Sequence, residues 1–179
     1  MTMSIEQFHD ALDEHGASVP LGELVQLMTD VEISVDDVAD CIKFSDECYQ
    51  RNLWRCGPGY AAIILCWKAG QASPIHDHKG SACGVRVLEG RITETIYSKK
   101  ADGSLQPGRT RIYEPGSVCG SYDTDIHVIA NREFAGDLVT LHVYTPPMSG
   151  YRVFEPDGLF HICEDSTAKK VAALVAAMR

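Results

Sequence analysis

Residues 70–90 read GQASPIHDHKGSACGVRVLEG and carry the most informative pattern of the chain. His76 and His78 stand two positions apart, just after a segment rich in turn residues. Side chains two positions apart in a strand face the same side, so both imidazoles can reach one metal ion. Two histidines at this spacing also arise by chance on a polar strand face, so the pair alone is a weak sign of metal binding.

Short runs of β-branched and aromatic residues surround this segment from about residue 49 onward. Glycine, proline and aspartate separate them, and the runs cover residues 61–67, 84–88, 91–97, 109–113, 127–130, 138–144 and 151–154. This spacing predicts a mainly β fold, an antiparallel barrel or sandwich. We expect the β-barrel to occupy residues 49–160.

The first 48 residues show helical periodicity instead. Ser4 opens a segment with Phe8 and Leu12 on one face, and a second segment follows Pro20. Ser34 begins a third, with apolar residues spaced as on one face of an α-helix: Val35, Val38, Ala39 and Ile42. These residues predict a helical N-terminal scaffold.

The C-terminal end predicts one more helix, over residues 166–178. Ser166 or Thr167 can cap it. Its apolar stripe would be Val171, Leu174, Val175 and Met178. Since no linker or repeat interrupts the chain, we expect one domain over residues 1–179.

The composition restricts the class of protein. The chain has 179 residues, is 45% hydrophobic and has a formal net charge of -9. That charge predicts no nucleic-acid partner. The longest apolar runs are far shorter than the roughly 20 residues of a membrane span, and the start lacks the pattern of a signal peptide, so we expect a cytoplasmic protein without membrane contact. The seven cysteines contain no CxxC pair, which argues against a disulfide framework or a zinc ribbon.

Wider spacing around the two histidines resembles the cupin superfamily. The order Gly70, His76, His78, Cys83 and Gly90 matches the first cupin motif, with cysteine in place of the usual glutamate. The pair His127 and Asn131 resembles the end of the second motif. The resemblance implies a small antiparallel β-barrel, or jelly roll, with His127 as a third metal ligand.

Six separated segments narrow the resemblance to the cysteine dioxygenase family. They are YQRNL at residues 49–53, ILCW at 64–67, IHDH at 75–78, SAC at 81–83, His127, and LHVYTPP at 141–147. What this implies is Fe(II) held by His76, His78 and His127. The implied reaction adds both atoms of O2 to the thiol of L-cysteine and gives cysteine sulfinate. The resemblance also implies a monomer.

The chemistry of three histidines is compatible with this reading. Three neutral imidazoles leave coordination positions open and bring no negative charge, so the site should favour an anionic thiolate. Zinc is the chief competitor, because three histidines also suit catalytic zinc. Ligand type alone therefore leaves a hydrolytic or lyase-type zinc site open.

Three further residues are candidates for the substrate pocket, and the resemblance gives a defined role to one of them. Arg51 would hold the substrate carboxylate, which suits a guanidinium that can bind a carboxylate through two hydrogen bonds. Related dioxygenases of 3-mercaptopropionate carry glutamine at this position, so Arg51 favours the amino acid. Tyr49 would lie near the same carboxylate, and Trp67 would wall the pocket or belong to the core.

The resemblance also implies a covalent bond beside the metal. In eukaryotic members, the residues corresponding to Cys83 and Tyr144 form a thioether crosslink. Without the crosslink, Cys83 would be a buried free thiol beside the tyrosine. The Tyr144 hydroxyl would donate to oxygen or substrate, and His142 and Thr140, on the same strand face, would orient it. The bond before Pro146 is a candidate for the cis form.

Besides the zinc site, two alternative functions stay open at this point. One is a dioxygenase of a related small thiol, such as 3-mercaptopropionate or cysteamine. The other is a metal-binding cupin that senses thiols without catalysis, which would bind metal and ligand but consume no O2.

Overall fold

The computed structural model describes residues 2–132, 136–164 and 166–178. The mainly β architecture expected from the sequence is confirmed. The described strands are β1 (Gln50–Gly57), β2 (Tyr60–Trp67), β3 (Ala82–Glu89), β4 (Ile92–Lys99), β5 (Leu105–Tyr113), β6 (Val118–Ser121), β7 (Ile126–Ala130), β8 (Leu138–Thr145), β9 (Tyr151–Phe154) and β10 (Phe160–Cys163). The helices are α1 (Ile5–Glu14), α2 (Leu21–Asp30), the short 3₁₀ helix η1 (Asp36–Cys41) and α3 (Ser166–Ala177).

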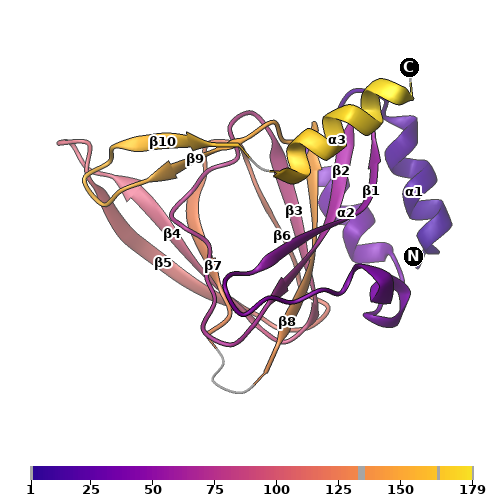
Figure 1. Ribbon diagram of the computed structural model, residues 1–179, viewed down its shortest axis with the longest axis horizontal. Helices are drawn as coiled ribbons and strands as arrows, with labels where there is room; N and C mark the ends of the chain where they lie inside the picture. Colours follow the sequence, from indigo (N-terminus) through magenta and orange to yellow (C-terminus); the bar gives the residue numbers. More distant parts are fainter. Residues whose placement is uncertain (1, 133–135, 165, 179) are drawn as a thin grey trace.

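The strands form two facing sheets and a hairpin (Figure 1). One sheet has the order β1-β2-β8-β3-β6, the other has the order β5-β4-β7, and β9 pairs with β10. All these pairs are antiparallel. His76 lies in the connection between β2 and β3 and makes isolated β-bridges to His127 of β7 and Val153 of β9. The connection therefore pairs with β7 and β9, which lie outside the sheet that contains β2 and β3.

The side chains of β2 alternate between two hydrophobic cores, one under the helices and one inside the barrel. Ala62, Ile64 and Cys66 face the helices, whereas Ile63, Leu65 and Trp67 face the barrel interior. Side chains of a strand point to alternate faces, so a strand covered on both sides is apolar throughout, as β2 is. The same alternation turns Thr140, His142 and Tyr144 of β8 toward the interior, since Leu141 and Val143 belong to the helix-side core.

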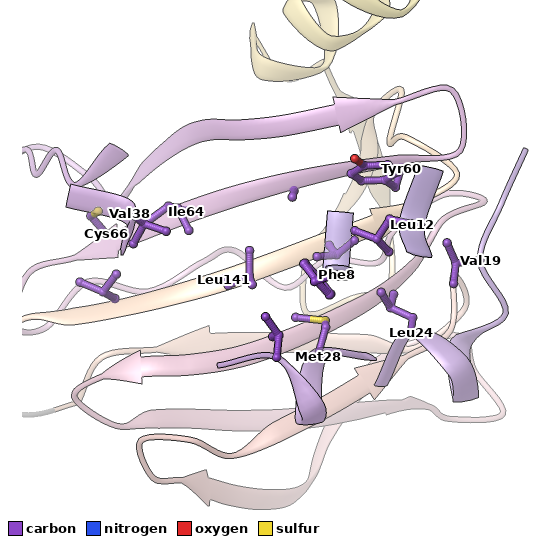
Figure 2. Packing of buried hydrophobic residues seen from close by; sticks show 14 residues of the cluster. Phe8, Leu12, Val19, Leu24, Met28, Val38, Tyr60, Ile64, Cys66 and Leu141 are labelled. Carbon is purple, nitrogen blue, oxygen red and sulfur yellow. The ribbon is translucent and has the colours of Figure 1, made fainter. Parts of the chain in front are cut away.

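Helices α1 and α2 cover the outer face of the five-stranded sheet. Figure 2 shows Phe8 and Leu12 of α1 and Leu24 and Met28 of α2 pointing at the strands. Ser4 caps α1 through a capping box with Gln7, as the sequence predicts. The helices thereby bury the sheet's outer face and leave its inner face for the site.

The third N-terminal segment is a 3₁₀ helix rather than an α-helix, so that expectation was wrong. The carboxylate of Asp37 accepts hydrogen bonds from the Ser34 amide and hydroxyl, which start the turn. Val38 then takes φ -120°, outside the helical range, and is the buried member of η1. Val35, Cys41 and Ile42 pack against the same core but are only partly buried, which gives little packing to sustain a longer helix.

The sequence missed three strands, β1, β6 and β10. None of these segments shows a run of β-branched residues: they read QRNLWRCG, VCGS and FHIC. Backbone pairing with a neighbouring strand forms them instead, as β1 pairs with β2 over residues 50–57. Tertiary context overrides a weak local preference here.

The C-terminal helix differs from expectation in two respects. It begins at Ser166, so Ser166 and Thr167 lie within it rather than before it, and the preceding residue is outside the described ones. Of the expected stripe, Val171 is buried and Val175 partly buried, but Leu174 and Met178 are exposed. The helix packs against β1 through a narrower face than predicted. Within the described residues, no helix is long and apolar enough to cross a membrane.

Candidate metal centre

Three histidines converge in the barrel interior. One ligand nitrogen from each of His76, His78 and His127 lies within 4.8 Å of the other two. His127 comes from β7, whereas His76 and His78 lie in the irregular connection between β2 and β3. The expectation of a regular strand for this pair was wrong, because His76 makes only isolated bridges and Lys79 turns the chain with a positive φ.

The Nδ1 atoms of the three rings contact different partners. The Nδ1 of His127 lies 2.8 Å from Oε1 of Glu94, and the Nδ1 of His76 lies 3.0 Å from the Pro74 carbonyl. Both partners accept only, so each Nδ1 carries the proton and each Nε2 is left with its lone pair. The Nδ1 of His78 lies 3.4 Å from the Ser121 hydroxyl.

The donor set fits a metal ion. The Nε2 of His127 is buried and has no hydrogen-bond partner among the described residues, although buried polar atoms are nearly always satisfied. A metal ion at the point where the three rings meet would satisfy it. Burial, with a contribution from His127, lowers the pKa of His76 to about 3, and burial lowers the pKa of His78 well below its ordinary value. Both rings are therefore neutral near pH 7, the form that binds metal.

Glu94 is a site residue that the sequence interpretation missed. It lies on β4, is buried, and its Oε2 accepts a hydrogen bond from the Tyr113 hydroxyl at 3.0 Å. Burial alone would raise the pKa of Glu94, but hydrogen bonds from His127 and Tyr113 outweigh it and hold the pKa below its usual value. The available signal was a single charged residue on an otherwise apolar alternation, Ile92, Glu94 and Ile96.

A chain of hydrogen bonds runs along the opposite wall of the site. The Trp67 indole N–H donates to the Thr140 hydroxyl at 3.1 Å, and Thr140 lies 3.0 Å from Nε2 of His142. The Nδ1 of His142 lies 3.4 Å from the Tyr144 hydroxyl, which accepts a hydrogen bond from Arg51 at 3.2 Å. The network joins Thr140, His142 and Tyr144, as expected, and extends beyond them at both ends.

The network is held in a fixed protonation state. Burial keeps the pKa of His142 well below its ordinary value, and the positive charge of Arg51 is the second largest cause. Burial raises the pKa of Tyr144 above its ordinary value, so the phenol keeps its proton near pH 7. A protonated phenol beside a neutral imidazole can donate a hydrogen bond or pass a proton.

The predicted substrate residues line the same small cavity as the three histidines. This cavity includes Arg51, Tyr49 and Trp67. The Arg51 guanidinium lies 5.2 Å from the centre of the Tyr144 ring, and the Tyr49 and Trp67 rings stack with centres 4.1 Å apart. A cation therefore lines the same cavity as the metal ligands, with aromatic rings beside it.

Cys83 lies directly opposite Tyr144 in the pairing of β3 with β8. Both side chains are buried, and the Cys83 sulfur lies 3.9 Å from Nδ1 of His142. Burial raises the pKa of the Cys83 thiol, so it is not a thiolate near pH 7. A directly opposed pair brings the two side chains into contact range.

One contact supports the site from outside. Asp77, between the two histidines, is buried and binds the Arg152 guanidinium at 2.6 Å, which ties the histidine connection to β9. The Thr145–Pro146 peptide bond is cis.

Comparison with known proteins gives consistent matches. A family model described as cysteine dioxygenase type I matches residues 2–157. Cysteine dioxygenase type 1 of Danio rerio is 30% identical over 143 residues, which are 77% of this chain and 71% of that protein. The Homo sapiens protein of the same name is 29% identical over 144 residues, 78% of this chain and 72% of that protein.

Solved structures resemble the fold. A Klebsiella pneumoniae protein with a double-stranded β-helix domain superposes with a TM-score of 0.53 at 14% identity, covering 75% of this chain and 92% of that one. TT1209 from Thermus thermophilus superposes with a TM-score of 0.52 at 18% identity, covering 64% of this chain and 98% of that one. At these identities the likeness shows the fold alone.

Proposed function

The chain belongs to the cysteine dioxygenase type I family, and from that membership we propose that it is an iron-dependent dioxygenase that converts L-cysteine and O2 to cysteine sulfinate. The observation that carries the proposal is the pairing of a three-histidine centre with Arg51 in one cavity. One half suits a metal and the other suits the carboxylate of a small amino acid.

We assign Fe(II) to His76, His78 and His127. Iron would supply the redox chemistry that joins O2 to the substrate sulfur, which zinc cannot supply. The three neutral rings bring no charge of their own, so the site favours an anionic thiolate over a neutral ligand.

The remaining residues would bind and orient the substrate. Arg51 would bind the carboxylate, with Tyr49 beside it and the Tyr49–Trp67 stack closing that side of the cavity. Tyr144 would donate a hydrogen bond from its phenol, and His142, backed by Thr140 and Trp67, would hold that phenol in place. Arg51 also contacts the phenol oxygen, so carboxylate and proton donor share one anchor.

The function is tested by O2 uptake of the anaerobically iron-loaded protein. We expect rapid uptake with L-cysteine and a product heavier by two oxygen atoms. Cysteamine lacks the carboxylate and 3-mercaptopropionate lacks the amine, so both should react more slowly. Uptake with 3-mercaptopropionate alone would change the substrate assignment, and iron binding without uptake of O2 for any of the three thiols would favour a thiol sensor.

Replacing Cys83 with alanine should abolish a thioether crosslink to Tyr144. We expect protein incubated with Fe(II), O2 and L-cysteine to lose two hydrogen atoms in mass, with the Cys83 sulfur joined to an ortho carbon of Tyr144 and O2 taking up the hydrogens. Peptide mass spectrometry measures this. Cys119→Ala is the control, since Cys119 contributes to the same interior core. Wild-type protein with unchanged mass after turnover would contradict the crosslink.

That the enzyme acts as a monomer in the cytoplasm stays a prediction. Sedimentation of the iron-loaded protein at two concentrations measures the first, and fractionation of cells that produce the chain measures the second.

A further inference from the structure

The three histidines of the centre differ in what supports them. His127 faces a carboxylate, His76 a backbone carbonyl and the Ser73 hydroxyl, and His78 the Ser121 hydroxyl. We propose that Glu94 is a positioning residue that makes His127 the strongest electron donor of the three, and so tunes the affinity and reduction potential of the bound metal. The inference rests on the proposed function, because it treats the three histidines as ligands of a redox-active ion.

The position of Glu94 follows from the pairing of β4 with β7. His127 stands opposite Ile96, and Glu94 is two residues further along the same face of β4. This diagonal relation brings Oε1 of Glu94 within 2.8 Å of Nδ1 of His127. Both side chains are buried, with relative exposures of 6% for Glu94 and 3% for His127. Solvent therefore screens their interaction little.

A second diagonal pair fixes the carboxylate from its other side. Tyr113 of β5 stands opposite Ile92, two residues from Glu94, and its hydroxyl donates to Oε2 at 3.0 Å. Arg111 Nη1 in turn lies 3.4 Å from that hydroxyl. Each carboxylate oxygen thus has its own donor, so the carboxylate cannot rotate without breaking one bond.

The chemical effect acts through the imidazole ring. A carboxylate that accepts the Nδ1 proton fixes the tautomer and raises the basicity of Nε2. It also places one buried negative charge near a centre whose three ligands carry none. A negative charge stabilises the more highly charged state of the metal, which lowers its reduction potential. Carbonyl and hydroxyl partners at the other two histidines bring no such charge.

The decisive experiment compares Glu94→Gln with wild type in the full chain. Glutamine keeps the shape and a hydrogen-bond acceptor but removes the charge. Co(II), which does not turn over with O2 and thiol, is titrated against a chelator. We expect the variant to bind Co(II) about 10- to 100-fold more weakly. The Fe(III)/Fe(II) midpoint potential of the iron-loaded variant should be higher than that of wild type. Equal affinity and equal potential would overturn the proposal.

Two matched variants separate charge from structure. Ser121→Ala removes the partner of His78, a neutral one, and should change Co(II) affinity less than Glu94→Gln. Tyr113→Phe removes one of the two donors to Glu94 but keeps the charge and the bond to His127, so Co(II) affinity should fall much less than in Glu94→Gln. If Tyr113→Phe weakens binding as much as Glu94→Gln, Glu94 has a merely structural role and the proposal is wrong.

If Glu94→Gln does not fold, Glu94→Asp takes its place in the test. Aspartate keeps the charge but draws it back by one methylene, so Co(II) affinity should fall further in Glu94→Asp than in Tyr113→Phe. Wild-type affinity in Glu94→Asp would overturn the proposal. Normal Co(II) binding together with no O2 uptake by the iron-loaded wild type would overturn the proposed function alone, because Co(II) affinity decides the role of Glu94 independently.

Discussion

Replacing His127 with alanine should remove the metal and abolish turnover. His127 contributes one of three nitrogens that meet within 4.8 Å, and its Nε2 has no other hydrogen-bond partner among the described residues. Losing a ligand should cost more affinity than the roughly 10- to 100-fold that loss of a supporting residue costs. The variant also leaves Glu94 buried without its principal donor. Metal content after gel filtration, and O2 uptake with excess Fe(II), measure the effect.

The control for this variant is His161→Ala. His161 is exposed on β10, outside the three-histidine group, so its replacement should leave metal content and turnover at wild-type values. Full metal content in His127→Ala would mean that a different group of residues holds the ion.

Arg51→Ala should reduce kcat/KM for L-cysteine severely and kcat/KM for cysteamine far less, since cysteamine loses only the contact of Arg51 with the Tyr144 phenol. Removing one partner of a desolvated charge pair costs about 2–5 kcal/mol. Each 1.4 kcal/mol is about tenfold, so kcat/KM should fall roughly 30-fold or more, chiefly through KM. Cysteamine has no carboxylate, so the substitution removes no such charge pair from its complex. Steady-state O2 uptake with both thiols measures the difference between them.

Two further variants make this result specific. Arg55→Ala removes a cation from the same strand, one that binds Asp13 and Tyr60 outside the cavity, and should leave the preference for cysteine unchanged. Arg51→Lys keeps the charge but loses the planar pair of donors, so it should recover only part of kcat/KM. Unchanged cysteine kinetics in Arg51→Ala would show that the carboxylate binds elsewhere.

The spacing of His76 and His78 indicated a shared metal, whereas His127, Arg51 and Tyr144 were expected at the centre through the family resemblance. His76 and His78 stand in one short motif. The period-two alternation of a strand places Thr140, His142 and Tyr144 on one face of β8, and this holds independently of the rest of the fold. The local geometry of the first pair was not accessible. Residues 76–78 are held by isolated bridges to distant strands and by the Asp77–Arg152 pair, and no local preference encodes such contacts.

Glu94 illustrates what the sequence cannot supply. It lies 33 residues from His127, and their contact depends on the register between β4 and β7. A shift of one residue would turn Glu94 to the other face of its sheet. The same reason explains why Trp67 was left between a pocket and a core role: its bond to Thr140 depends on the pairing of β2 with β8.

The two sheets of the barrel hold different halves of the site. Arg51, His142 and Tyr144 belong to the five-stranded sheet, whereas His127 and Glu94 belong to the three-stranded one. The distance between His127 and Arg51 is thus an inter-sheet distance, to which the packing of interior side chains such as Val87, Ile92 and Leu138 contributes. Changes of volume in that packing would move one half relative to the other. A lineage could in this way adapt to longer or shorter thiols without altering any residue that touches them.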